Sequence, residues 1–376
     1  MVTSNPILFT IICVFGLQAI VLSGLILRKR PKRQANIFLA LMVFFYALIG
    51  LNIVLVNVLK DFDLIFVFRY IQMEMLFGIG PSIFFYTKCI SQPKFKFQNK
   101  HLVHFLPLLI EFIFYRTSIY RIGSDGLYLE EMPTYSYIYF TQQWLGVFSI
   151  WLYSILSIIV LSKYHKRLKS YYSKIENLSL KWLQTPIIIY VSYHFLWRLI
   201  TEIDRFAFDK TLREYYFIPN FVILAAVTCW IGFKGYIQKE QEITYYTSNT
   251  NNSEKLIIKE KDKEFLSMLQ NLMETKKPFL NPDLNLTMLS EMIELKPKQL
   301  STKINQNCEK NFYDLINSYR VEAFKERLQS ENQSKMSLLG HALECGFYSK
   351  STFNSAFKKM TQQTPSEYLK SLKKES

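Results

Sequence analysis

Seven long apolar runs crowd the first 236 residues, and they restrict the fold more than any other feature of this chain. A helix needs about 20 mostly apolar residues to cross the hydrocarbon core of a bilayer. The rest of the chain has an ordinary soluble composition. We therefore predict an all-α chain, in which a seven-helix transmembrane bundle precedes a soluble helical domain. The spans are expected at residues 7–27, 35–58, 64–86, 102–115, 137–161, 183–203 and 216–236.

Positive charge is unevenly distributed among the loops between these runs. One alternating set of loops holds 14 Lys and Arg residues, five of them in the stretch 28–33, and the other set holds six. The richer set is normally cytoplasmic. Because the charges follow the first run, that run differs from a signal peptide. We predict a multi-pass protein of the inner (cytoplasmic) membrane, with its N-terminus outside and its C-terminus in the cytoplasm.

Ionisable side chains inside membrane spans are costly, and they usually face protein or water. Two interpretations stay open for those in the predicted spans: a polar pocket that senses a signal, or pairs that hold the bundle together. Arg198 and Glu202 are an i,i+4 pair, and their place near a membrane surface favours the second interpretation for them. The candidates for intramembrane sensing or structural roles are Arg69, Glu74, Glu111, His194, Arg198 and Glu202.

Residue types that catalyse reactions or bind metals form no motif in this sequence. The five cysteines include no Cys-x-x-Cys pair, and His101 and His104 have no third ligand nearby. A phosphate-binding glycine loop, a nucleophile elbow and a kinase motif are also absent from the sequence. We therefore predict no enzyme activity, no metal site and no cofactor.

Residues 238–253 are polar and aperiodic, and we predict a cytoplasmic linker at residues 237–261. A helical pattern begins within it and extends over residues 254–275. A first helix-turn-helix unit is predicted at residues 287–305. There Thr287 can cap a helix that buries Leu289, Met292 and Ile293. Pro297, a favoured residue in the first helical turn, opens the second helix of this unit.

A second helix-turn-helix unit is predicted at residues 337–360. Ser337 can cap its first helix, and Ser349 can cap its second. Between them, Gly346 permits a left-handed turn that a Cβ atom would resist, and Phe347 fills the core. An amphipathic helix at residues 311–329 joins the two units and can set their spacing.

The second helix of each unit presents hydroxyl, amide and ammonium groups on its outer face. Hydroxyls and amides can read base edges in the major groove, whereas lysines mostly contact phosphate. The predicted DNA-binding residues are Lys298, Gln299, Ser301, Thr302, Lys303, Ser349, Lys350, Ser351, Thr352, Asn354, Ser355, Lys358 and Lys359.

The soluble half resembles the AraC/XylS class of transcriptional regulators over residues 262–372. The resemblance implies an all-helical domain with two DNA-binding helix-turn-helices, which regulates transcription at specific promoters. A sensing or dimerising domain usually accompanies it, and here the bundle of residues 1–236 would take that role. The resemblance rests on Ile316-Asn317-Ser318-Tyr319-Arg320, Glu344-Cys345-Gly346-Phe347, Phe353, Ala356-Phe357-Lys358-Lys359 and Thr364-Pro365-Ser366-Glu367-Tyr368.

Three positions depart from the pattern of that class. Glu309 and Gln362 stand where glycine is frequent, just after each DNA-reading helix, and Phe324 stands where a small residue is common. We expect the first two to adopt left-handed backbone conformations, at a cost of about 1 kcal/mol each.

These features predict a membrane-embedded transcriptional regulator that responds to an unknown signal. The expected partners are double-stranded promoter DNA, the lipid bilayer and a small-molecule or lipid signal, with RNA polymerase and a second copy of the chain (a homodimer) as further candidates. One alternative is a transporter or membrane enzyme that carries an autoregulatory DNA-binding domain, but the sequence shows no internal repeat to favour a transporter. Another is a bundle that serves only as a tether.

Overall fold

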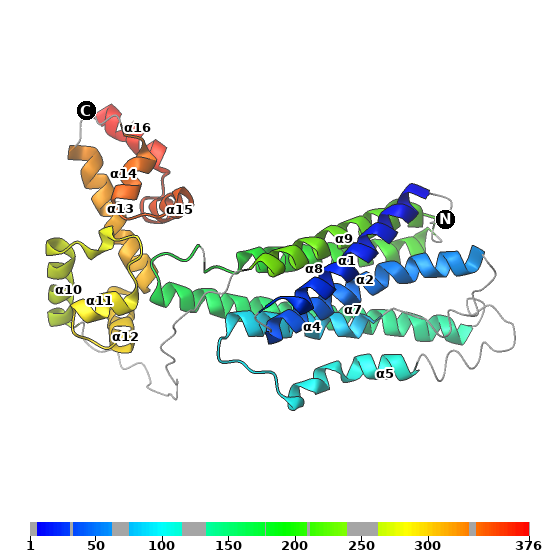
Figure 1. The fold of residues 1–376 in the computed structure, drawn as a ribbon. Helices are drawn as coiled ribbons and strands as arrows, with labels where there is room; N and C mark the ends of the chain where they lie inside the picture. The colour runs from blue at the N-terminus through cyan, green and yellow to red at the C-terminus, as the bar shows by residue number, and fades with distance from the viewer. Residues whose placement is uncertain are drawn as a thin grey trace. The chain divides into compact units, whose positions relative to one another are not determined.

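The computed structural model describes residues 6–30, 33–61, 75–114, 133–176, 178–208, 211–238, 262–330 and 336–375. Every named element in these ranges is helical, which confirms the predicted all-α class (Figure 1). Two compact units are present: residues 1–164 with 180–240, and residues 165–179 with 241–376. The stretch 165–179, predicted to belong to the first domain, therefore packs with the C-terminal unit.

The N-terminal unit is a bundle of apolar helices in which α2 contacts α1, α4 and α9. Close approach of α4 to α7 depends on Gly80, because a Cβ atom there would lie 3.0 Å from the Ser149 carbonyl oxygen. The helices are α1 (Pro6–Arg28), α2 (Gln34–Asp61), α4 (Leu76–Ser91), α5 (Leu106–Phe114, preceded by the 3-10 helix Asn99–Phe105), α7 (Pro133–Tyr171), α8 (Lys181–Ala207) and α9 (Arg213–Ile237).

Two described segments are long and apolar enough to cross a bilayer, Gln34–Asn52 and Thr141–Tyr171. Ile12–Arg28 and Val222–Ile237 are apolar but shorter. The buried core helix of a soluble protein can meet the same criterion, so the seven-span bundle stays a prediction. Much of the predicted third span, residues 64–86, lies outside the described residues.

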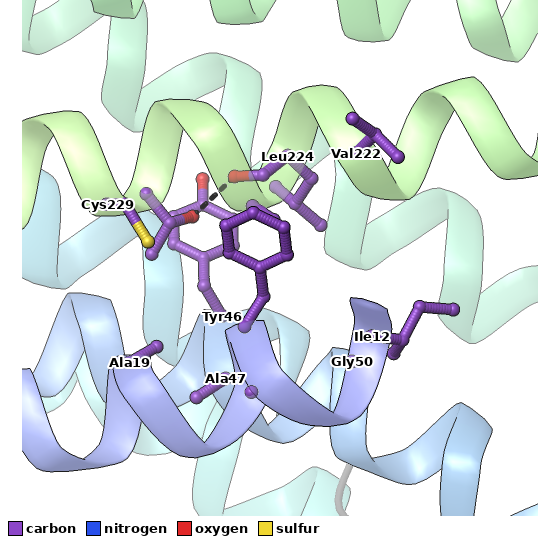
Figure 2. Close-up of a pocket in the computed structure, with 12 residues that line it drawn as sticks. Ile12, Ala19, Tyr46, Ala47, Gly50, Val222, Leu224 and Cys229 are labelled. Atoms are coloured by element: carbon purple, nitrogen blue, oxygen red, sulfur yellow. Dashed lines mark hydrogen bonds between the residues drawn. The ribbon is translucent and has the colours of Figure 1, made fainter. Parts of the chain in front are cut away.

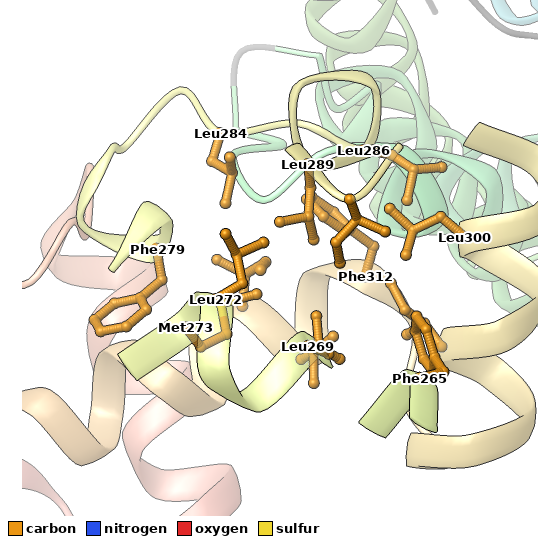
Figure 3. Packing of buried hydrophobic residues seen from close by; sticks show 14 residues of the cluster. Phe265, Leu269, Leu272, Met273, Phe279, Leu284, Leu286, Leu289, Leu300 and Phe312 are labelled. Atoms are coloured by element: carbon orange, nitrogen blue, oxygen red, sulfur yellow. The ribbon is translucent and has the colours of Figure 1, made fainter. Parts of the chain in front are cut away.

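The C-terminal unit contains two hydrophobic cores that share one helix. The first core gathers residues of α10, α11 and α12, and Figure 3 shows Phe265, Leu289 and Leu300 pointing into it. The second core gathers residues of α14 and α15. The elements are α10 (Lys263–Thr275), the 3-10 turn η6 (Pro278–Leu280), α11 (Leu286–Met292), α12 (Pro297–Cys308), α13 (Phe312–Ser330), α14 (Leu338–Glu344), α15 (Lys350–Thr361) and α16 (Pro365–Glu375).

The shared helix is α13, the connector that the amphipathic pattern predicted. Its first half buries Phe312 and Ile316 in the first core, and its second half buries Val321 and Phe324 in the second. The Phe324 ring packs 4.6 Å from the ring of Phe353, measured between centroids. A large residue at position 324 therefore fills the second core.

Candidate nucleic-acid interface

The first helix-turn-helix consists of α11 and α12, joined by a turn with Glu294 in a left-handed conformation (φ 58°). The predicted capping residue was wrong. Asn285, rather than Thr287, accepts a hydrogen bond from the Met288 backbone N–H at 3.1 Å, so the helix begins earlier than expected. Met292, predicted to be buried, is 43% exposed because it ends the helix beside the turn.

Helix α12 carries the first set of predicted DNA-binding residues. Lys298, Gln299 and Thr302 are exposed, whereas Ser301 and Lys303 are half-buried. The Gln299 amide oxygen accepts a hydrogen bond from the Lys296 backbone N–H, which ties that side chain to the start of the helix. The remaining exposed groups form the polar face of this helix.

Lys303 is engaged within the domain, because its ammonium group pairs with the carboxylate of Asp262. Asp262 is also the N-cap of α10, where it accepts a hydrogen bond from the Phe265 backbone N–H at 3.0 Å. The hydrogen bond from Lys303 holds the pKa of Asp262 below its ordinary value. This lysine is therefore already paired with a carboxylate of its own domain.

The second helix-turn-helix consists of α14 and α15, and both predicted caps are confirmed. Ser337 Oγ accepts from the Gly340 backbone N–H at 3.1 Å, and Ser349 Oγ accepts from the Thr352 backbone N–H at 3.2 Å. Gly346 adopts the predicted left-handed conformation with φ +88°. The turn at Gly346 lies so close to η6 that a Cβ atom added to this glycine would lie 2.3 Å from the Phe279 carbonyl oxygen.

Helix α15 presents a continuous polar face with one exception. Thr352, predicted to point outward, is only 7% exposed, because it lies beside Phe353 on the side of the helix that meets the core. Lys359 forms an ion pair with Asp314 of α13 at 2.8 Å while staying largely exposed. The exposed predicted residues are Lys350, Ser351, Asn354, Ser355, Lys358 and Lys359, and Ser349 is half-buried.

Helices α12 and α15 both end at the non-glycine residues singled out in the sequence. Glu309 has φ 54° and Gln362 has φ 61°, so both adopt the expected left-handed conformation. Each residue marks the end of one helix and turns the chain towards the next, α13 and α16.

Arg320 is a structural residue whose role the sequence pattern did not reveal. It is 1% exposed and donates hydrogen bonds to the carbonyl oxygens of Phe279 and Asn281, both at 2.8 Å, and to Asn317 Oδ1 at 3.2 Å. Burial lowers the pKa of Arg320 to about 10. An arginine on the otherwise apolar face of this amphipathic helix was the available signal, because buried charges require partners.

The predicted intramembrane residues divide into separate groups. Arg198 pairs with Glu202 at 3.8 Å, as their spacing predicted, and Arg198 lies 4.6 Å from the Trp144 ring centroid. Glu111 instead accepts a 2.5 Å hydrogen bond from Gln142. Arg69 and Glu74 lie outside the described residues.

His194 of α8 lies in an aromatic setting. Its ring centroid is 5.3 Å from that of Trp197, 5.4 Å from that of Tyr190 and 6.5 Å from that of Trp151. Within the described ranges, no group of three or more His, Cys, Asp or Glu side chains is placed to hold a metal ion.

An apolar pocket between α1, α2 and α9 lies in the N-terminal unit (Figure 2). No pattern in the sequence predicts this pocket. The Thr228 hydroxyl in its wall is satisfied by the Leu224 carbonyl oxygen at 2.7 Å, drawn as a dashed line. The lining residues are Ile12, Phe15, Gly16, Ala19, Tyr46, Ala47, Gly50, Val222, Leu224, Ala225, Thr228 and Cys229.

Comparison with known proteins finds one family. Residues 289–371 match a family described as a helix-turn-helix domain. The match extends from within α11 to within α16 and supports an AraC-type regulator. The family is a DNA-binding one rather than an enzymatic one. No curated protein and no solved structure gives a significant match to the chain. The matched region therefore indicates a DNA-binding transcriptional regulator.

Proposed function

We propose that this chain is a membrane-embedded regulator, in which the N-terminal helices lie in the lipid bilayer and control the DNA-binding domain in response to a signal. The observation that carries this proposal is the set of apolar stripes on the N-terminal unit. Exposed apolar residues of α7 recur at steps of three and four: Leu145, Phe148, Leu152, Ile155 and Ile159.

The same pattern occurs on other helices of this unit. On α1 the exposed residues are Val14, Leu17, Val21 and Leu25, and on α8 they include Ile188, Phe195, Leu199 and Ile203. Residues at such steps share one helix face. Soluble monomers rarely expose apolar patches of this extent, which mark surfaces for protein or lipid contact. Lipid tails are the simplest cover for stripes on several helices.

For the DNA-binding half, we propose that the exposed faces of α12 and α15 enter successive major grooves. Asn354 and Ser355 carry the groups that read bases, and Lys350 and Lys358 contact phosphate. The connector α13 supports this arrangement, because one continuous helix contributes to both cores. RNA polymerase and a second copy of the chain are further proposed partners.

For the signal, we propose a lipid or apolar small molecule that binds in the pocket of α1, α2 and α9. The wall of that pocket is mainly apolar, and its Thr228 hydroxyl is already hydrogen-bonded. Such a ligand shifts the regulator only if it binds two states with different affinities. Gly50 offers a test, since a Cβ atom there would meet only Ile12, at 3.9 Å. Gly50→Leu should therefore reduce the transcriptional response by filling space in the pocket.

One experiment tests membrane insertion and DNA binding together. The full chain is expressed in a bacterium, membranes are washed at alkaline pH, and bound promoters are recovered by immunoprecipitation. We expect the wild type and the double variant Lys350→Ala/Asn354→Ala to stay in the washed membranes, whereas only the wild type recovers promoter DNA. Loss of one phosphate contact and one base contact should weaken binding at least tenfold, since a good base contact contributes about 1–3 kcal/mol.

A matched control removes the same two residue types from the opposite end of the domain. Asn271 and Lys276 lie on the exposed surface of α10 or just after it. The variant Asn271→Ala/Lys276→Ala should recover promoters as the wild type does. Recovery of promoters by the α15 variant would overturn the assignment of that face, and release from washed membranes would overturn membrane insertion.

A further inference from the structure

A short stretch between α7 and α8, residues 172–176, packs against the DNA-binding domain; we name it the docking segment. It belongs to the C-terminal unit although more than 100 residues separate it from the helix-turn-helix units in the sequence. Tyr172 forms a backbone bridge with Asn285, the N-cap of α11. The segment therefore begins its contact at the first helix-turn-helix unit.

Ser173 anchors the docking segment in the domain core. This serine is 1% exposed, its hydroxyl donates to the Leu284 carbonyl oxygen at 2.5 Å, and its backbone N–H donates to the same oxygen at 3.4 Å. The Ser173 hydroxyl also accepts a 3.3 Å hydrogen bond from the buried guanidinium of Arg320. The segment thus shares the arginine that bridges η6 and α13.

Lys174 extends the contact to the second helix-turn-helix unit. Its ammonium group pairs with Asp283 at 2.9 Å and lies 3.4 Å from the ring centroid of Tyr348. Tyr348 directly precedes Ser349, which caps α15. One lysine therefore holds the turns that introduce α11 and α15.

Glu176 reaches the beginning of the second DNA-reading helix. Ser349 Oγ donates a 3.1 Å hydrogen bond to Glu176 Oε1, while Glu176 Oε2 is buried with no hydrogen-bond partner among the described residues. Burial raises the pKa of Tyr313 on α13, and the negative charge of Glu176 raises it further. The Glu176 carboxylate therefore also lies close to α13. Glu176 is half-buried, and leaving its buried Oε2 without a partner costs stability.

The position that Glu176 occupies is one that DNA phosphate would use. Hydroxyls and backbone N–H groups at the beginning of a DNA-reading helix commonly bind phosphate oxygens. A carboxylate oxygen accepts hydrogen bonds from the same donors and carries the same sign of charge. The two anions therefore cannot share the Ser349 end of α15.

We propose that the docking segment is an internal competitor of DNA, which places Glu176 on the Ser349 end of α15 and must withdraw before that helix engages phosphate. Because the segment is continuous in sequence with α7 and α8, movement of those helices would pull it away. Competition rests only on DNA binding by the helix-turn-helix domain, whereas control by the bundle rests on the proposed membrane function.

The test measures DNA affinity of the full chain in detergent, using promoter fragments recovered with either the wild type or Glu176→Ala. We expect Glu176→Ala to bind about tenfold more tightly, the scale of one charge-assisted hydrogen bond. The control Glu264→Gln removes a negative charge from the exposed start of α10, and its effect gives the contribution of net charge alone. Equal gains in the two variants, or weaker binding by Glu176→Ala, would overturn the proposal.

A second readout follows the contact itself. A carbodiimide should join Lys174 to Asp283 in the free chain, and saturating promoter DNA should reduce that product several-fold by mass spectrometry. A product that DNA leaves unchanged would overturn the proposal even if Glu176→Ala folds poorly. Both measurements use detergent-purified protein, so they stand whether or not the washed-membrane experiment supports insertion.

Discussion

At the scale of the residue, Gly346 is the position at which one added carbon atom has the largest expected effect. Its φ of +88° disfavours a side chain, and a Cβ atom would lie 2.3 Å from a backbone oxygen that has little freedom to move. We expect Gly346→Ala to destabilise the second helix-turn-helix by about 3 kcal/mol or more. The buried neighbour Cys345 reports this locally, because its alkylation by iodoacetamide should accelerate in the variant, as followed by mass spectrometry. Gly24→Ala, where a Cβ atom meets nothing within 4 Å, should leave the rate unchanged. An unchanged rate in Gly346→Ala would show that η6 yields to the added methyl group.

At the scale of the element, part of the positive charge of α12 is neutralised within its own domain, because Lys303 pairs with Asp262. Asp262→Asn should keep the cap of α10, since Asn and Asp cap equally well, while releasing Lys303. The released lysine can bind a phosphate, so the plot of log affinity against log salt should steepen by about 0.9. Affinity measured from 50 to 200 mM salt, the range in which such slopes are resolved, checks this. Glu264→Gln on the same helix alters charge without touching Lys303, and it should leave the slope as in the wild type. A slope that does not change in Asp262→Asn would mean that Lys303 faces away from the duplex.

At the scale of the whole molecule, the expected topology follows from loop charge and from the need of the helix-turn-helix domain to meet DNA. Alkaline phosphatase fused after Phe208, between α8 and α9, should be active because that loop is expected outside the cytoplasm. Fusion after Phe97, which follows α4, should give an inactive enzyme, and a fluorescent protein at the C-terminus should fluoresce. Enzyme activity and fluorescence in whole cells provide the measurement. Activity after Phe97 would contradict the proposed orientation, because Lys94, Lys96 and Lys100 belong to the loop set assigned to the cytoplasm.

Local features of the DNA-binding half were largely predictable from sequence. The caps at Ser337 and Ser349, the turn at Gly346 and the left-handed Gln362 each follow from short-range backbone chemistry. Burial depth was less predictable. The 3.6-residue repeat predicts which face of a helix is buried. Thr352 lies at the edge of the buried face, and its exposure depends on the neighbouring elements.

Contacts between distant segments were not predictable at all. No local spacing relates Ser173 to Leu284 or Glu176 to Ser349, because these pairs meet only when the domain has folded. The same holds for Arg320, whose partners lie in η6 and beyond. The position of an arginine in an apolar pattern signalled a partner, but not its identity.

Helix α13, which belongs to both hydrophobic cores, also fixes the rotation of the second helix-turn-helix relative to the first. Each residue of an α-helix advances the chain by about 1.5 Å and rotates it by about 100°. Inserting one alanine into α13 between Ile316 and Val321 would therefore rotate the second helix-turn-helix by about 100° relative to the first. Under the proposed two-groove arrangement, a DNA site would need a different spacing between its two halves to contact both helices of such a variant. In the proposed arrangement, the length of α13 therefore sets the spacing between the two halves of the DNA site.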